Sequence, residues 1–305
     1  MNDILSTKHY GRIFLYTMAA TALLLIVIRY FVLPIWDSTL ATGWIGIVAK
    51  ITDSLTVSII VTVSVALFIR WLTPESLRKT QIEVVAPREI RSLLIGAAEK
   101  SKTWTYRGAC GRYTRVTTLT RMAEAAKREK SRREVRISVL DPGNDKLCVA
   151  YASYRNTFAD DSRNELWSSG SVRQEVVATI LSALCSEFRM LDINVYLLSF
   201  ISVFRVDISD EFVVVTKEDP KADALRAERG TFYYSSFFDE TKLYQSQSTK
   251  VELDPGINSF ARNSIDGERV KSLLEQLGIL SEAQLLTINF DKVASLIKDS
   301  KDPYK

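Results

Sequence analysis

Two long apolar runs stand near the start of the chain, and both have the length of a membrane helix. The first covers residues 13–33, and its 21 residues span about 31 Å at a rise of 1.5 Å per residue. The second covers residues 54–72 and has about the same length. A signal peptide is the alternative for the first run, but the run is too long and no small-x-small cleavage site follows it. The pattern therefore predicts a transmembrane hairpin over residues 1–73.

Charges around the two runs indicate how the hairpin is oriented. Lys8 and Arg12 precede the first run, Arg70 and Lys79 flank or follow the second, and the short connection between them carries little positive charge. Positive residues beside membrane helices stay on the cytoplasmic side. Arg29, the one charge inside the first run, can snorkel to the interface. We therefore expect a two-span protein of a bacterial inner membrane with both termini in the cytoplasm.

Small side chains recur every four residues in the second run. The stripe is formed by Ser54, Ser58, Thr62 and Ala66. Such stripes let membrane helices approach closely and share hydrogen bonds. One interpretation is a helix that associates with further copies of itself, so that a homo-oligomer opens or disturbs the bilayer. The other is ordinary packing of the second helix on the first, because small residues are common in all membrane helices.

From residue 74 onward, helical and strand patterns alternate. Strand patterns occupy TWTYRG, EVRISVL, INVYLLSF, VFRVDI and EFVVVTK. The segment SVRQEVVATILSALCSEFRML has the spacing of a helix, with a capping box from Ser171 to Gln174. Its predicted buried stripe consists of Val172, Val176, Ile180, Leu184 and Phe188. Alternation of this kind predicts a three-layer α/β domain over residues 74–266.

The pattern weakens after Thr216. EDPKADALRAERG is charged and indicates a loop, whereas the aromatic segment GTFYYSSFFDE indicates a strand. The last stretch has the pattern of short helices, with a second capping box at Ser281 and Gln284. We expect residues 267–305 to form a small helical appendage.

Charge is spread unevenly along the chain. The net charge is +4, but between Lys100 and Arg136 twelve Lys or Arg stand against three Glu, which gives a local +9 and leaves −5 for the rest. This asymmetry predicts an anionic neighbour for one face of the protein: phosphates, nucleic acid or lipid head groups.

Two residue types limit the chemistry that the chain can perform. Cys110, Cys148 and Cys185 are widely spaced and form no CxxC pair, which is typical of reduced thiols in a cytosolic domain. The single histidine is His9, at the extreme N-terminus. Most hydrolytic mechanisms use histidine as base or nucleophile, so we expect no catalytic residue, no metal and no cofactor. The arginines and glycines around Cys110 favour a lowered thiol pKa, but no histidine is available as its base.

The segment WTYRGACGRYTR, residues 104–115, is the strongest candidate for a binding site. Arginine, glycine and tyrosine gather there where an apolar strand ends, at Arg107, Gly108, Gly111, Arg112, Tyr113 and Arg115. Glycine-flanked amides favour anions, arginine holds phosphate, and tyrosine stacks on bases. One interpretation is a docking face for nucleic acid, a nucleotide or lipid head groups. The other is a structural turn whose arginines are solvated or pair with Glu134 and Asp141.

The elements predicted between residues 86 and 216 follow a recognisable order. A helix, a strand ending in W-x-Y-R-G, a helix, a strand ending in V-L-D-P, a long helix and paired strands succeed one another. This order resembles one half of a phospholipase D-like fold. Catalytic members of that superfamily carry H-x-K-x4-D, whereas the corresponding SVFRVDISDEFVVV has Phe204 and Val206 in that neighbourhood and no histidine. The resemblance implies a degenerate domain without the catalytic histidine and lysine.

The layout of a short membrane hairpin before a soluble domain resembles the two-transmembrane effectors of bacterial antiphage defence. It is similar to the effectors encoded beside retron reverse transcriptases. The resemblance implies a toxic effector of abortive infection, which a reverse transcriptase with its RNA-linked DNA keeps inactive until release disrupts the inner membrane. Membrane effectors gated by cyclic nucleotides share the layout, so a nucleotide signal is an alternative trigger.

Other functions remain open from the residues themselves. A membrane-tethered phosphodiesterase or nuclease-like enzyme would need metal-bound carboxylates in place of histidine, such as Asp141, Asp207 and Asp210. Asp141 stands in LDPGN, where an aspartate more often only makes the turn. A scaffold protein without toxicity is the third possibility.

Overall fold

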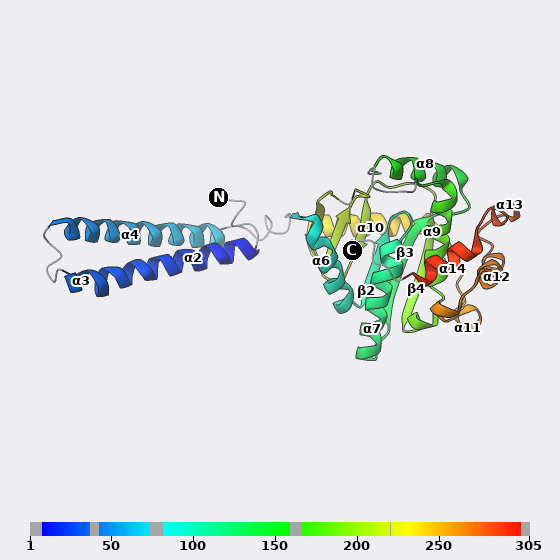
Figure 1. The fold of residues 1–305 in the computed structure, drawn as a ribbon, viewed down its shortest axis with the longest axis horizontal. Coiled ribbons are helices and arrows are strands. Elements are labelled where there is room, and N and C mark those ends of the chain that lie inside the picture. The colour runs from blue at the N-terminus through cyan, green and yellow to red at the C-terminus, as the bar shows by residue number, and fades with distance from the viewer. Residues whose placement is uncertain (1–7, 37–42, 73–81, 159–165, 220, 300–305) are drawn as a thin grey trace. The chain divides into compact units, whose positions relative to one another are not determined.

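The chain forms two compact units, Met1–Arg78 and Lys79–Lys305. The first is helical and the second is a mixed α/β domain (Figure 1). The computed structural model describes five ranges of residues, namely 8–36, 43–72, 82–158, 166–219 and 221–299.

The N-terminal unit is a pair of helical segments that lie side by side (Figure 1). Its elements are α2 (Lys8–Val27), the π-helical η1 (Ile28–Val32), α3 (Leu33–Trp36) and α4 (Gly43–Leu72). Within α4, the 23 residues Gly46–Phe68 are long and apolar enough to cross a bilayer. The apolar part of the first segment, Tyr16–Val32, is shorter. The described residues thus contain one helix that meets the length and composition of a membrane span, where the sequence predicted two.

A charged pair connects the two helical segments. Nε of Arg29 donates to Oδ1 of Asp53 at 2.8 Å. Arg29 lies in η1, so the local π turn carries the side chain that bonds to α4. Arg29 therefore has a partner inside the hairpin, whereas the sequence predicted only that it snorkels to the interface.

The predicted stripe of small residues winds around α4. Ser54 and Ser58 are exposed, Thr62 is half-buried and Ala66 is buried. Each step of four residues turns about 40° beyond a full turn, so the stripe rotates by about 120° over its length. Its last residue lies among the buried positions of the helix pair, as Ala49 does, while Ser54 and Ser58 stay on the outer surface.

The second unit is built on one mixed sheet of eight strands in the order β1-β7-β6-β5-β2-β3-β4-β8. The strands are β1 (Glu83–Val85), β2 (Thr103–Arg107), β3 (Arg133–Leu140), β4 (Leu191–Leu198), β5 (Arg205–Ile208), β6 (Phe212–Thr216), β7 (Ala224–Glu228) and β8 (Thr249–Val251). β2, β3 and β4 are parallel, and the other neighbours pair antiparallel. Tyr106 of β2 stands between Ile137 of β3 and Asp207 of β5.

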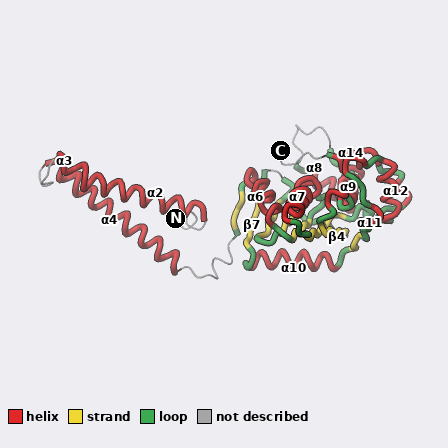
Figure 2. Tube along the Cα trace, turned by 90° about the horizontal axis from the view of Figure 1, so that it is seen from below, coloured by secondary structure: helices red, strands yellow, loops and turns green. Residues whose placement is uncertain are grey.

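Helices cover both faces of the sheet. They are α6 (Pro87–Lys100), η2 (Thr114–Thr118), α7 (Leu119–Glu129), α8 (Asp145–Asn156), α9 (Ser169–Ser182), η3 (Ser186–Phe188), α10 (Phe232–Ser246), α11 (Pro255–Asn258), η4 (Arg262–Ser264), α12 (Gly267–Leu277), α13 (Glu282–Leu285) and α14 (Phe290–Lys298). Figure 2 shows α6, α7 and α9 on one face and α10 on the other. The α/β class predicted from the sequence is confirmed, and the layers are helix, sheet and helix.

The larger core lies between the sheet and the α9 side. Val176 and Ile180 of α9 are fully buried there, as the sequence predicted. The C-terminal helices belong to the same core, since Val270 of α12 and Val293 of α14 are also fully buried. α14 packs on α9, which ties the last helices to the sheet domain.

Two segments after Thr216 differ from their predicted structure. GTFYYSSFFDE lies in α10 rather than in a strand, because Thr231 caps the helix by accepting from the Tyr234 N–H at 3.2 Å. Tyr234 and Phe238, one helical turn apart, pack on the smaller core beneath α10, so the aromatics follow helical spacing. The charged segment before it contains β7 between β1 and β6 rather than only a loop.

The two predicted capping boxes had different outcomes. The box at Ser281 and Gln284 is confirmed at the start of α13. α9 instead begins with a box formed by Ser168 and Ser171, three residues before the predicted one. α9 also ends at Ser182, so Leu184 and Phe188 are buried beyond the helix rather than on its stripe.

Candidate functional site

The carboxyl ends of the parallel strands β2, β3 and β4 meet at one end of the sheet, which we call the carboxyl pole. β2 ends at Arg107, Asp141 follows the end of β3, and β4 ends at Leu198. Ligand sites of open α/β sheets gather at this end. The segment of residues 104–115 turns there, so its geometry decides what it can bind.

Both glycines of this turn are required by close packing. A Cβ on Gly108 would stand 2.2 Å from the hydroxyl oxygen of Tyr106. Gly111 has a φ of +70°, and a Cβ there would stand 2.8 Å from Cγ2 of Thr179. The Gly111 N–H donates to the Tyr106 hydroxyl at 3.1 Å. The amide that the sequence assigned to an anion therefore has a partner inside the protein.

Arg107 fixes α10 to the sheet. Its side chain is 3% exposed, and its Nη2 donates to Oε2 of Glu240 at 2.9 Å. The guanidinium lies over the ring of Tyr244, 4.9 Å from the centroid. Burial lowers the pKa of Arg107, and the charge of Glu240 opposes that shift. The first arginine of the turn is thus part of a contact between β2 and α10 rather than of an open surface.

Arg115 makes the most complete set of contacts. Its side chain is 1% exposed, and its Nη2 donates to Oε2 of Glu175 at 2.9 Å. Its Nη1 donates to the Glu175 carbonyl at 3.1 Å and to Oγ1 of Thr179 at 3.2 Å. Arg112 differs, with 40% of its side chain exposed and Asp299 at 3.9 Å. The contacts of Arg115 with Glu175 and Thr179 join η2 to α9.

Tyr113 and the two acidic residues predicted to pair with the arginines, Glu134 and Asp141, make contacts other than those expected from the sequence. Tyr113 is buried, with the Arg205 guanidinium 5.9 Å from its ring centroid. Glu134 pairs with Arg136 at 2.7 Å, and Oδ1 of Asp141 accepts from the Gly143 N–H at 2.8 Å. The predicted pairing with Glu134 and Asp141 is therefore wrong. The docking function of the segment stays a prediction, for which Arg112 is the exposed arginine of the three.

The three carboxylates considered for metal chemistry lie at different levels of the sheet. Asp141 follows the end of β3, Asp207 stands opposite Tyr106 of β2, and Asp210 accepts from the Lys102 N–H at 2.6 Å, beside the start of β2. Within the described residues, no three His, Cys, Asp or Glu side chains come together in a group that could hold a metal ion. The geometry therefore gives the carboxylate hypothesis no shared site.

Burial shifts two groups that chemistry could use. Asp207 is 1% exposed and pairs with Nε of Arg205 at 3.2 Å. Burial raises the pKa of Asp207, and the charge of Arg205 opposes the shift. Burial also raises the pKa of the Cys110 thiol well above its usual value, with Glu175 adding to the effect. The lowered thiol pKa predicted from the arginines around Cys110 is therefore wrong, because the thiol lies in the core.

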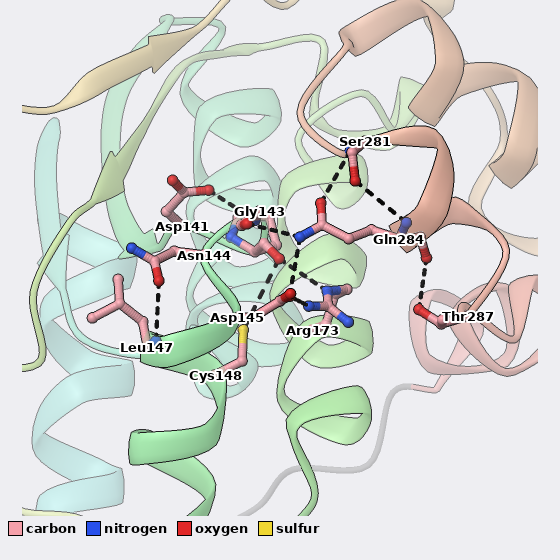
Figure 3. A network of polar contacts seen from close by, with 11 residues as sticks. Asp141, Gly143, Asn144, Asp145, Leu147, Cys148, Arg173, Ser281, Gln284 and Thr287 are labelled. Atoms are coloured by element: carbon pink, nitrogen blue, oxygen red, sulfur yellow. Dashed lines mark hydrogen bonds and ion pairs between the residues drawn. The ribbon is translucent and has the colours of Figure 1, made fainter.

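A polar network holds the turn after β3 at the same pole (Figure 3). The Asn144 side chain accepts from the Leu147 N–H at 3.2 Å and caps α8. Nε of Arg173, from α9, donates to the Pro142 carbonyl at 2.9 Å, and its Nη2 pairs with Asp145. The turn is thus held from two helices, which agrees with the structural interpretation of Asp141.

Gln284 connects the C-terminal helices to this turn (Figure 3). Its Oε1 accepts from the Ser281 N–H at 3.0 Å, which completes the capping box of α13. Its Nε2 donates to the Gly143 carbonyl at 2.8 Å and to Oδ1 of Asp145 at 3.0 Å. One amide side chain therefore caps its own helix and bonds to a loop 141 residues earlier.

Comparison with known proteins adds little to this geometry. No protein-family model and no curated protein matches the sequence. Among solved structures the chain is similar to TrmBL2, described as an archaeal chromatin protein with a novel mode of DNA binding, at 12% identity and a TM-score of 0.33. That match covers 66% of this chain and 66% of that one, just under two thirds. The chain is also similar to Nuc from Salmonella typhimurium, a phospholipase D family member, at 15% identity and a TM-score of 0.31, covering 57% of this chain and 99% of that one. At these TM-scores neither similarity assigns a function.

No sequence pattern indicates the acidic partners of the arginines at the carboxyl pole. Glu175 and Glu240 lie 60 and 133 residues away from the arginines they bind. Asp145 and Gln284 are likewise brought together only by the fold. The capping box around Gln284 was visible in the sequence, but it gives no hint of the second bond that this side chain makes.

Proposed function

We propose that this chain is a membrane-anchored effector whose two helical segments act in the bilayer and whose Lys79–Lys305 unit is a non-enzymatic control module in the cytoplasm. The observation that carries the proposal is the ion pair between Arg29 and Asp53. It joins the two segments inside their apolar lengths, Tyr16–Val32 and Gly46–Phe68.

The unfavourable free energy of a charge in a membrane helix is the reason that this pair is informative. A charged side chain within the apolar length of a membrane helix is unfavourable unless it has a partner or reaches the interface. Such residues face a partner or a polar path, and they mark functional positions. A pair at 2.8 Å lets each charge compensate the other. This supports a hairpin in which the shorter first segment crosses the membrane together with α4.

The flanking charges support the orientation. In the sequence, Lys8 and Arg12 precede the apolar part of the first segment and Arg70 and Lys79 end or follow the second, while residues 37–42 contain no Lys or Arg. By the positive-inside rule, this charge pattern supports cytoplasmic termini and a cytoplasmic Lys79–Lys305 unit as part of the proposal.

The resemblance to antiphage effectors supplies the biological form of the proposal. In that form the large unit is held by a reverse transcriptase with its RNA-linked DNA, or responds to a nucleotide signal, and release lets the hairpins disrupt the inner membrane. The exposed Ser54 and Ser58 offer a surface on which copies of α4 can associate.

The test measures membrane potential with a voltage-sensitive dye in bacteria. We expect rapid depolarisation from the full chain and none from residues 79–305. Arg29→Asp and Asp53→Arg should each reduce depolarisation per inserted protein, and the two changes together should restore it. Growth arrest caused by the 79–305 fragment, or by the full chain with the potential intact, would contradict the proposal.

A further inference from the structure

The twelve basic residues between Lys100 and Arg136 divide into two groups of six. One group has carboxylate partners, at Arg107, Arg112, Arg115, Arg121, Arg133 and Arg136. The other group is exposed and forms no ion pair within the described part of the chain, at Lys100, Lys102, Lys127, Arg128, Lys130 and Arg132. The excess charge that the sequence revealed is therefore carried at the surface by this second group.

The second group gathers at the amino ends of the parallel strands, which we call the amino pole. Lys100 and Lys102 stand directly before β2. Lys127 and Arg128 end α7, and Arg132 directly precedes β3. The amino pole is opposite the carboxyl pole, so the free positive charge lies away from the arginine turn of residues 104–115.

A pocket of about 540 Å³ opens at the amino pole. Its volume falls in the range of about 300–1,000 Å³ that small-molecule sites occupy. Arg132, Arg189 and Lys250 line it and are exposed, so they bring three positive charges to its mouth. Asp192 and Glu252 also line it, which leaves a net charge of +1 from three minus two.

The buried residues that line this pocket are apolar and uncharged. Cys185 and Phe188 are buried, and Leu253 is half-buried. Burial raises the pKa of Cys185 to about 12, so its thiol stays neutral at physiological pH. Asn194 adds one amide that can both donate and accept.

The residues that line this pocket favour some classes of anionic partner over others. A membrane surface would need large apolar side chains projecting beside the basic ones, and none of the pocket-lining residues is an exposed large hydrophobic residue. A single strand of nucleic acid would need exposed aromatic rings for successive bases, whereas Phe188 and Phe260 are buried. A compact anion with a flat apolar part fits the apolar residues and the exposed basic residues that line this pocket.

We propose that this pocket binds a free nucleotide, with its phosphates at Arg132, Arg189 and Lys250 and its base against the half-buried Leu253 and Asn194. The site is independent of what the N-terminal helices do in a membrane. It also lies apart from the candidate arginines of the carboxyl pole.

The test is equilibrium binding to the full chain in detergent micelles. A panel of ribonucleoside mono- and triphosphates is screened by equilibrium dialysis, beside inorganic triphosphate, a 20-residue oligothymidylate and vesicles of phosphatidylglycerol. We expect saturable binding of at least one nucleotide, weakened by salt. Arg132→Gln and Arg189→Gln should each weaken it about tenfold. Leu253→Asn should weaken the nucleotide but not inorganic triphosphate.

The matched control is Lys146→Gln, an exposed lysine in the first turn of α8 at the carboxyl pole, which should leave affinity unchanged. Each variant is checked for folding by the protection of its buried cysteines. Three outcomes overturn the proposal: no nucleotide of the panel binds, the arginine variants bind as the unaltered chain does, or oligothymidylate or vesicles bind more tightly than every nucleotide through the same arginines.

Discussion

Two sets of basic residues, one at each pole of the sheet, are used in different ways. At the carboxyl pole, Arg107 and Arg115 are 3% and 1% exposed and bond to carboxylates from other helices. At the amino pole, Lys127, Arg128 and Arg132 are exposed without an ion pair within the described residues. The first set stabilises the fold, and the second set is free to meet a ligand.

The difference teaches that a local excess of charge along a sequence does not by itself produce a charged surface, because the fold buries some of the charged residues. Strand alternation and the depth of a turn decide which arginines enter the core, and neither is visible in a charge count. The run from Lys100 to Arg136 contributes to both poles, because β2 and the helix after it cross the domain between them.

The largest effect is expected from replacing Arg115, which is more deeply buried than Arg107 at the carboxyl pole. Arg115→Met leaves Glu175 buried without its partner, which should lower the free energy of unfolding by about 3–5 kcal/mol. All three cysteines are buried and lie in the Lys79–Lys305 unit, so thiol labelling in increasing urea reports the opening of that unit in the full chain.

Two further variants give this result its controls. Adding Glu175→Leu to Arg115→Met should recover most of the loss, because an apolar pair replaces the ion pair. Arg112→Met should cost about 1 kcal/mol or less, since this arginine is 40% exposed. Equal losses for Arg112→Met and Arg115→Met would show that depth does not separate them.

A smaller effect is expected from the turn itself. Gly111→Ala forces a side chain onto a φ of +70° and to 2.8 Å from Thr179, which should cost about 1–3 kcal/mol. Gly96→Ala is the matched control, because nothing lies within 4 Å of its Cβ position in α6 and the helix should gain about 0.5–1 kcal/mol. The same labelling assay measures both changes, and a loss at Gly96 would contradict the packing argument.

A further prediction concerns how the buried carboxyl group of Asp207 makes the stability of the protein depend on pH. Because burial raises its pKa in the folded state, the folded protein keeps this proton to a higher pH than the unfolded chain does. Its contribution to stability is complete below the unfolded pKa of about 3.8 and is lost as pH rises through the folded pKa. Asp207→Asn should therefore flatten the decline of stability with pH above this value, measured by urea unfolding at a series of pH values.

The smallest effect on stability is expected at the amino pole. Changing Lys127, Arg128 and Lys130 together to Gln should alter the free energy of unfolding by about 0.5 kcal/mol or less, because these side chains are exposed and unpaired within the described residues. A loss comparable to that of Arg115→Met would remove the distinction between the two poles.

Much of the fold was predictable from local patterns, but the sites were not. Apolar spacing gave Val176 and Ile180 as core positions of α9, and the Ser281 capping box was read from four residues. α10 was missed because aromatic residues suggest a strand until the sheet face that they cover is known. The partners of Arg107 and Arg115 come from helices far along the chain, so only tertiary packing reveals them.

The edge of the sheet has a mechanical consequence. β1 is the first strand of the Lys79–Lys305 unit, and it pairs with β7 through three residue pairs and one ion pair, between Glu83 and Arg226 at 2.9 Å. Tension passed along the backbone from the N-terminal helices reaches this short ladder before any other strand. Under such load, β1 should therefore separate from β7 first, while the central strands keep their register.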